Sequence, residues 1–164
     1  MKTLYLVRHA KSSWDDPGLS DFDRPLNNRG EKDAPKIGQR LKAQGIIPDG
    51  IYSSPAIRAI TTGKIIAEIV GYPVNSIHTD RNLYHADRDV LFITVRSIPD
   101  SFDHVMIVGH NPGLTELANE LIPSTIDNIP TTGIVAIQLN LNSWKAVNKN
   151  CGHLLFFDYP KRDK

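Results

Sequence analysis

Five stretches of the chain are apolar and short enough to be strands of a buried sheet. They cover residues 4–7, 51–53, 105–108, 134–139 and 154–157. The first three are continuous runs of apolar or β-branched residues, which is typical of strands covered on both faces. Segments with helical periodicity alternate with these runs, so the pattern predicts βαβ units and a mostly parallel central sheet. The last two strands flank a turn at Asn142-Ser143, which indicates an antiparallel edge.

The first predicted helix precedes the second strand. Its apolar residues follow the i, i+3, i+4, i+7 spacing of a single buried stripe. Asn28 and Glu31 resemble a capping box at its start, with Asn in place of the usual Ser or Thr. The residues expected in the stripe are Ala34, Ile37, Gly38 and Leu41.

Three further helices are predicted. The second follows Ser54-Pro55 and can end at Gly71, the third runs from residue 87 to about residue 97, and the fourth follows Asn111-Pro112. The residues expected to be buried are Ala56, Ala59, Ile60, Gly63, Ala67 and Val70 in the second helix, and Leu114, Leu117, Ala118 and Leu121 in the fourth. Residues 11–26 are rich in Ser, Asp, Pro and Gly and are too long for a plain connection, so we expect a functional loop there.

Length and composition fit one globular domain spanning residues 1–164. The 19 Lys and Arg balance 18 Asp and Glu, so no nucleic-acid partner is expected. No apolar run reaches the ~18 residues of a membrane span, and Arg8 ends the first apolar run too early for a signal peptide. Cys151 is the only cysteine, which excludes an intramolecular disulfide and a multi-cysteine metal site. We therefore expect a cytoplasmic protein without membrane contact.

Charged and imidazole side chains follow three of the predicted strands. Arg8 and His9 come directly after the first strand, Arg58 lies in the first turn of the helix after the second, and His110 follows the third. Each of them alone is compatible with a structural or solvated role. Because ligands of parallel α/β sheets bind at the carboxyl ends of the strands, their common location predicts a site.

Two of these positions also combine a capping residue with a proline. Ser54-Pro55 and Asn111-Pro112 are typical of helix starts. Such starts attract anions, and a cation such as Arg58 is unfavourable there unless an anion offsets it. Two arginines and two histidines around two helix starts therefore indicate a pocket for a phosphoryl group.

Three motifs carry a resemblance to a known family. Residues 6–10, 53–62 and 108–112 resemble the three signatures of the histidine phosphatase superfamily, which has the phosphoglycerate mutase-like fold. Residues 8–14, 21–26 and 29–30 are similar to its small SixA-type phosphohistidine phosphatase branch. The resemblance implies a three-layer α/β/α sandwich, no metal and no other cofactor. Ala10 departs from the usual Gly of the first motif; it keeps a backbone N–H but restricts φ.

The resemblance implies two-step phosphoryl transfer. His9 attacks phosphorus through an unprotonated ring nitrogen, and water then hydrolyses the phosphohistidine. Arg8 and Arg58 bind the equatorial oxygens, and His110 contributes as an imidazolium. The positive charge is expected to lower the pKa of His9.

The group that protonates the leaving atom restricts which substrates the site can act on. Larger members of the superfamily use a carboxylic acid after the second helix, but residues 81–87 contain no Glu. Asp87 can serve there or can cap the third helix. Imidazole is a better leaving group than a sugar or serine alkoxide, so a site without that acid suits phosphohistidine on a protein domain. Lys11, Trp14 and Arg24 are candidates to line the opening and contact such a partner.

Three alternatives follow from the same residues. The first is a phosphomonoesterase for a small phosphate ester, with Asp87 or His85 as proton donor. The second is a phosphate-binding module without turnover, favoured by Ala10 and the missing acid. The third, a thiol phosphatase using Cys151, needs a Gly-rich loop ending in Arg, which residues 152–155 do not provide.

Overall fold

The computed structural model describes residues 1–162 and contains a six-stranded sheet in the order β3-β2-β4-β1-β5-β6. The strands are β1 (Lys2–Arg8), β2 (Gly50–Ser53), β3 (His78–Thr79), β4 (His104–Gly109), β5 (Ile134–Leu139) and β6 (Gly152–Asp158). The first four are mutually parallel, whereas β5 is antiparallel to both β1 and β6. The predicted strands and the antiparallel edge are therefore confirmed. β3 was not predicted, because it is short and both of its residues are exposed.

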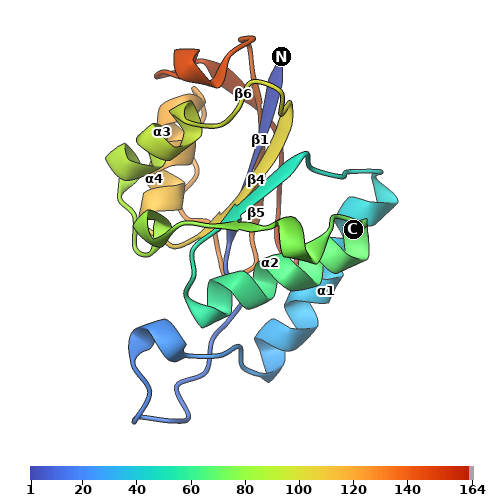
Figure 1. Ribbon diagram of the computed structural model, residues 1–164, viewed down its shortest axis with the longest axis vertical. Helices are drawn as coiled ribbons and strands as arrows, with labels where there is room; N and C mark the ends of the chain where they lie inside the picture. The colour runs from blue at the N-terminus through green and yellow to red at the C-terminus, as the bar shows by residue number, and fades with distance from the viewer. Residues whose placement is uncertain (163–164) are drawn as a thin grey trace.

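Helices cover both faces of the sheet and give it the predicted three layers (Figure 1). α1 (Asn28–Ala43) and α2 (Ile57–Val70) pack on one face, and α3 (Arg88–Arg96) and α4 (Gly113–Leu121) pack on the other. Side chains of the central strands alternate between the two faces, as the pleat requires. In β1, Leu4 and Leu6 join the core beneath α3 and α4, while Tyr5 and Val7 join the core beneath α1 and α2.

The first residues of the central strand are fixed by a buried lysine. Lys2 Nζ donates to the carbonyl oxygens of Asp100 and Phe102 at 2.6 and 3.1 Å, and it lies 2.9 Å from a carboxylate oxygen of Asp103. Register pairs continue along the strand until Arg8 lies opposite Gly109 of β4. The residue that follows β1 is therefore held beside the residue that follows β4.

The helices begin one or two residues from the predicted starts. α1 is capped by Asn27, whose side chain accepts from the Gly30 N–H at 2.9 Å, so the predicted cap at Asn28 was wrong by one residue. The first turn of α1 holds Glu31, whose backbone N–H donates to Asn27 O at 3.0 Å, but within residues 1–162 no hydrogen bond joins its side chain to the Asn27 N–H. Burial agrees with prediction except at Ile60, which is only partly buried.

The two proline-containing starts also differ from prediction. α2 begins at Ile57 with no side-chain cap, and Ser54 Oγ instead accepts from the Ala56 N–H at 3.2 Å in the turn before it. Pro112 occupies the cap position of α4 rather than its first turn, after a cis peptide bond. Asn111 Oδ1 accepts from the N–H and the hydroxyl of Thr115, at 3.2 and 2.9 Å. In both places a turn of extra residues separates the strand from the helix.

The loop between β1 and α1 projects beyond the end of the sheet (Figure 1). It contains the short 3₁₀ helix η1 (Asp21–Asp23), and a single bridge pairs Ser12 with Leu26. No helix in the described part of the chain is long and apolar enough to cross a membrane.

Candidate functional site

The side chains predicted from the strand ends line a single cavity of about 340 Å³. Arg8 and His9 come from the end of β1, Arg58 from the first turn of α2, and His110 from the segment after β4. The rings of His9 and His110 lie 5.2 Å apart between centroids. Lys11 and Arg24 line the same cavity, so the structure brings together all six residues that the sequence singled out for binding or catalysis.

The buried ring of His9 is held in one tautomer. Its Nδ1 lies 2.8 Å from the carbonyl oxygen of Ala10. A carbonyl can only accept, so Nδ1 carries the proton and the lone pair is on Nε2. Burial lowers the pKa of His9 to about 4; the bond to Ala10 opposes this, and the nearby charges of Arg58, Arg8 and Arg24 reinforce it. The predicted direction is right, but burial rather than charge is the largest cause.

Ala10 fits the position where the first motif usually has Gly. Its φ lies outside the left-handed region, and its side chain is fully buried beside Leu26 and Ala34. Its N–H donates to Thr62 Oγ1 at 2.9 Å. The N–H that alanine retains is thus used to join β1 to α2, and a glycine is not required.

His110 is buried, and its Nε2 lies 2.8 Å from Ser54 Oγ. Its Nδ1 has no hydrogen-bond partner within residues 1–162. Burial lowers the pKa of His110 to about 3, with contributions from His9, Arg58 and His85 in the same direction. The ring is therefore neutral at neutral pH in these surroundings, and the imidazolium expected against a phosphoryl group stays a prediction.

Arg8 has unused hydrogen-bonding capacity. One terminal nitrogen donates to the carbonyl of Ile129 at 3.1 Å, while its buried Nε has no partner in the described chain. Burial lowers the pKa of Arg8, yet a guanidinium stays charged at neutral pH. The side chain therefore brings a cation with a free donor to the cavity.

Arg58 is held by a residue that sequence reasoning did not single out. Its two terminal nitrogens donate to the carbonyl oxygen of Asp21 at 2.6 Å and to Asp21 Oδ2 at 2.9 Å. A carboxylate of the chain itself thus offsets the charge of Arg58 at the start of α2. The expected functional loop at 11–26 and the SixA-type resemblance of residues 21–26 included Asp21 but gave it no role.

Asp21 connects three segments that meet at the cavity. Besides Arg58, its carboxylate accepts from Tyr84 Oη at 2.6 Å, His85 Nε2 at 2.9 Å and Arg24 at 2.8 Å. Burial alone would raise the pKa of Asp21, but these four donors together hold it well below its usual range. Asp21 is therefore ionised and cannot donate a proton.

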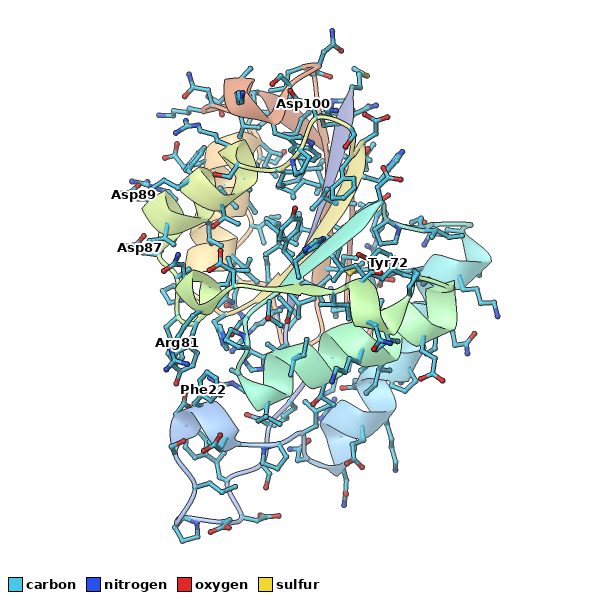
Figure 2. The ribbon with its side chains drawn as sticks, in the orientation of Figure 1. Phe22, Tyr72, Arg81, Asp87, Asp89 and Asp100 are labelled. Atoms are coloured by element: carbon cyan, nitrogen blue, oxygen red, sulfur yellow. The ribbon has the colours of Figure 1, made fainter. Side chains whose placement is uncertain are left out.

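Aromatic contacts hold η1 against the segment that carries Tyr84. The rings of Phe22 and Tyr84 meet edge to face at 5.1 Å, and the Arg81 guanidinium lies 5.0 Å from the centre of the Phe22 ring. Figure 2 shows Phe22 and Arg81 side by side where the two segments meet. Asp21 is thus supported by packing as well as by hydrogen bonds.

Arg24 and Lys11 differ in burial and in how many hydrogen bonds their side chains make within the loop. Arg24 is buried and donates to Ser13 O at 3.0 Å, to Asp21 and to Ser12 Oγ, so much of its capacity is used within the loop. Its guanidinium also lies 3.3 Å from the ring centre of Trp14, whose side chain is 76% exposed. Lys11 is exposed at the rim of the cavity.

The two candidate proton donors lie in different surroundings. Asp87 lies at the start of α3 (Figure 2) and caps it, with its carboxylate accepting from the Val90 N–H at 2.9 Å. It is not among the residues that line the cavity. His85 does line the cavity.

Cys151 lies far from this cavity. It directly precedes Gly152 of β6, which pairs with Leu139 of β5, and Leu139 pairs with Lys2 at the start of β1. Cys151 is therefore at the opposite end of the sheet from His9. The described chain contains no cluster of three or more His, Cys, Asp or Glu that could hold a metal ion.

Comparisons with known proteins agree with these features. The sequence profile of the histidine phosphatase superfamily (branch 1) matches residues 4–87. An uncharacterized chloroplast protein of Arabidopsis thaliana is 36% identical over 153 residues, which are 88% of this chain and 69% of that protein.

Two solved structures have the same fold. SixA from Agrobacterium tumefaciens, a protein assigned as a phosphohistidine phosphatase, is 27% identical with a TM-score of 0.79 over 97% of this chain and 98% of its own. The protein histidine phosphatase SixA in complex with tungstate has a TM-score of 0.83 at 22% identity, over 96% of this chain and 97% of its own. The fold is therefore the phosphoglycerate mutase-like α/β fold.

Proposed function

The chain belongs to the histidine phosphatase superfamily (branch 1), and from this membership we propose that it hydrolyses phosphohistidine on a protein through a phosphorylated His9. Phosphatase activity is supported by the superfamily and by the SixA-like fold. The observation that carries the proposal is the fixed tautomer of His9, which leaves the lone pair on Nε2. The His9 ring lines the same cavity as two arginines and a second histidine.

The proposed reaction has two displacements. The Nε2 lone pair of His9 attacks phosphorus while the bond from phosphorus to the leaving atom breaks, and that atom keeps the electron pair and takes a proton. Water then attacks phosphorus and loses a proton, the bond from phosphorus to Nε2 breaks with its electron pair returning to the ring, and inorganic phosphate is released. The depressed pKa of His9 keeps Nε2 unprotonated between turnovers at neutral pH.

Arg8, Arg58 and His110 stabilise the negative charge on the phosphoryl oxygens in the transition state. Guanidinium groups match the geometry of phosphoryl oxygens and can bind them in pairs. The unpartnered donors of Arg8 and His110 are free for this purpose. Because an opposite charge favours the protonated form of a histidine, we infer that His110 becomes an imidazolium only when the phosphoryl anion is bound.

The preference for phosphohistidine rests on the carboxyl groups near the cavity. Asp21 is ionised by its four donors, and Asp87 is used as a helix cap. A site without a protonated carboxylic acid favours a leaving group less basic than an alkoxide. Lys11 and Trp14 are exposed at the opening, which fits a phosphorylated side chain presented by another protein.

The phosphoenzyme tests the proposal directly. A protein carrying ³²P-phosphohistidine is mixed with wild type, with His9→Ala and with His153→Ala, which removes an exposed histidine of β6 as a matched control. We expect acid-labile, alkali-stable label on wild type and on the control, and none on His9→Ala. Label on His9→Ala, or none on wild type, would contradict the assignment of the nucleophile.

The substrate class needs a second comparison. We expect kcat/KM for the phosphohistidine protein to exceed that for sugar phosphates by about 100-fold or more, because a sugar alkoxide is a much more basic leaving group than imidazole. Equal or faster turnover of sugar phosphates would instead make the chain a phosphomonoesterase for small molecules.

A further inference from the structure

His85 has an unusual backbone conformation at the cavity. Its φ is 52°, in the left-handed region that a residue with a side chain rarely adopts. Strained residues of this kind persist only where their surroundings hold them, and they concentrate at functional sites. The ring is about half exposed and lines the cavity, with its centroid 4.8 Å from that of His110 and 4.2 Å from that of Tyr84.

The ring nitrogens of His85 have different roles. Nε2 lies 2.9 Å from Asp21 Oδ2. Since that carboxylate is ionised and can only accept, Nε2 carries a proton. Nδ1 forms no hydrogen bond within residues 1–162. A carboxylate that holds one imidazole nitrogen leaves the other oriented for proton transfer, which is how histidines act as general acids and bases.

We propose that His85 Nδ1 donates the proton to the leaving atom, and that Asp21 positions the ring for this step. The inference rests on the proposed function, because it concerns the leaving group of the same reaction. As the bond from phosphorus to the leaving atom breaks, that atom takes the proton from the His85 imidazolium. In the second displacement, neutral His85 takes a proton from the attacking water and is ready for the next cycle.

Other groups near this side of the cavity are less suited to the role. Asp21 is ionised, and Asp87 is fixed at the start of α3. The Tyr84 hydroxyl already donates to Asp21 at 2.6 Å. Burial raises the pKa of Tyr84 and its bond to Asp21 raises it further, so it holds its proton. His85 remains the group with both an anchored nitrogen and a free one.

A series of aryl phosphates with increasingly basic leaving groups tests the proposal. The series runs from 2,4-dinitrophenyl phosphate, whose anion leaves without help, to phenyl phosphate, whose leaving oxygen needs a proton. The main variant is His85→Asn, because asparagine tolerates the left-handed conformation and its amide cannot transfer a proton. We expect its loss of kcat/KM on phenyl phosphate to exceed its loss on 2,4-dinitrophenyl phosphate by about 100-fold.

His85→Gln is the second variant, in case the first does not fold, and His153→Asn is the matched control at an exposed histidine of β6. An equal loss on every substrate of the series, or no loss, would overturn the proposal, because a merely structural role does not depend on the leaving group. Added imidazole should partly restore turnover of phenyl phosphate by His85→Asn; no restoration would also count against the proton transfer.

The same assay separates this proposal from the proposed function. If wild type forms a phosphoenzyme at His9 from 2,4-dinitrophenyl phosphate while the leaving-group dependence is unchanged in His85→Asn, only the role of His85 fails. If no phosphoenzyme forms from any substrate, the two-step mechanism itself fails.

Discussion

The cavity has two halves that are built in different ways. The first contains Arg8, His9 and His110, which follow β1 and β4 and are fixed by neighbours such as Ala10 and Ser54. The second contains Asp21, Arg24 and His85, which lie on irregular segments and are joined by hydrogen bonds between residues up to 64 positions apart. The strand-end half thus depends on sheet register, whereas the loop half depends on one carboxylate. Arg58 belongs to α2 but is held by the loop half.

The largest effect is expected where the two halves meet. Arg58→Lys keeps the charge but loses the planar fork that contacts Asp21 twice. We predict a fall in kcat/KM of about 10²–10³-fold, as for removal of one donor to a transition-state oxyanion. Steady-state kinetics measures it, with Arg96→Lys, on α3 and outside the cavity, as the control. A loss equal to that of the control would mean that the fork contributes only its charge.

A smaller loss is expected from the loop half alone. Asp21→Asn removes the anion that holds Arg58, and we predict a fall in kcat/KM of about 30-fold, from loss of hydrogen bonds to charged groups. Because the pKa of Asp21 is depressed in the folded state, its contribution to stability is present above about pH 4 and is lost as the pH falls further. The free energies of unfolding of wild type and Asp21→Asn, measured in urea, should therefore differ most at neutral pH. A difference that persists unchanged in strong acid would contradict the ionised carboxylate.

The strand-end half should respond to pH in a different range. The pKa of His9 is lowered to about 4, while an unfolded histidine titrates near ~6.5. Between these values the unfolded chain binds more protons, so the free energy of unfolding rises from about pH 4 to about pH 6.5 and then levels off. His9→Gln should reduce this rise by roughly 2–3 kcal/mol, measured by urea unfolding at about pH 4.5 and 7.5. If the free energy of unfolding rises equally with pH in wild type and His9→Gln, His9 is not buried as a neutral ring.

The smallest effect is expected at the opening. Trp14 is exposed, and its replacement by Ala should change stability by no more than about 0.5 kcal/mol. If partner proteins contact this ring, Trp14→Ala should raise KM for a phosphohistidine protein by a few-fold, which is about 1 kcal/mol. KM for a small aryl phosphate should stay the same. An equal change in KM for both substrates would mean that Trp14 affects the cavity itself and not the contact with the partner protein.

The two halves also differ in how far the sequence predicts them. Placement after predicted strands is sufficient to assign Arg8, His9, Arg58 and His110 to one edge of the sheet. Asp21 has no such signal, because its partners Tyr84 and His85 become neighbours only when the loop folds back. The anion expected beside Arg58 was a bound phosphoryl group, and the local sequence did not indicate that the carboxylate of Asp21 also neutralises this cation.

Local details were also outside the reach of pattern reasoning. The starts of α1, α2 and α4 were misplaced because the residues before them also make long-range contacts. The Asn27 N–H donates to Lys11 O, Ser54 Oγ lies 2.8 Å from His110 Nε2, and Asn111 Nδ2 donates to Ile129 O. The low pKa of His110 was not predicted because its largest cause is burial, which the sequence does not reveal.

The carboxylate next to Arg58 has a consequence for the end of the catalytic cycle. A guanidinium already neutralised from within attracts inorganic phosphate less strongly than a bare one, because two anions share the same cation. We therefore expect the proposed phosphatase to release its product readily and to be only weakly inhibited by inorganic phosphate.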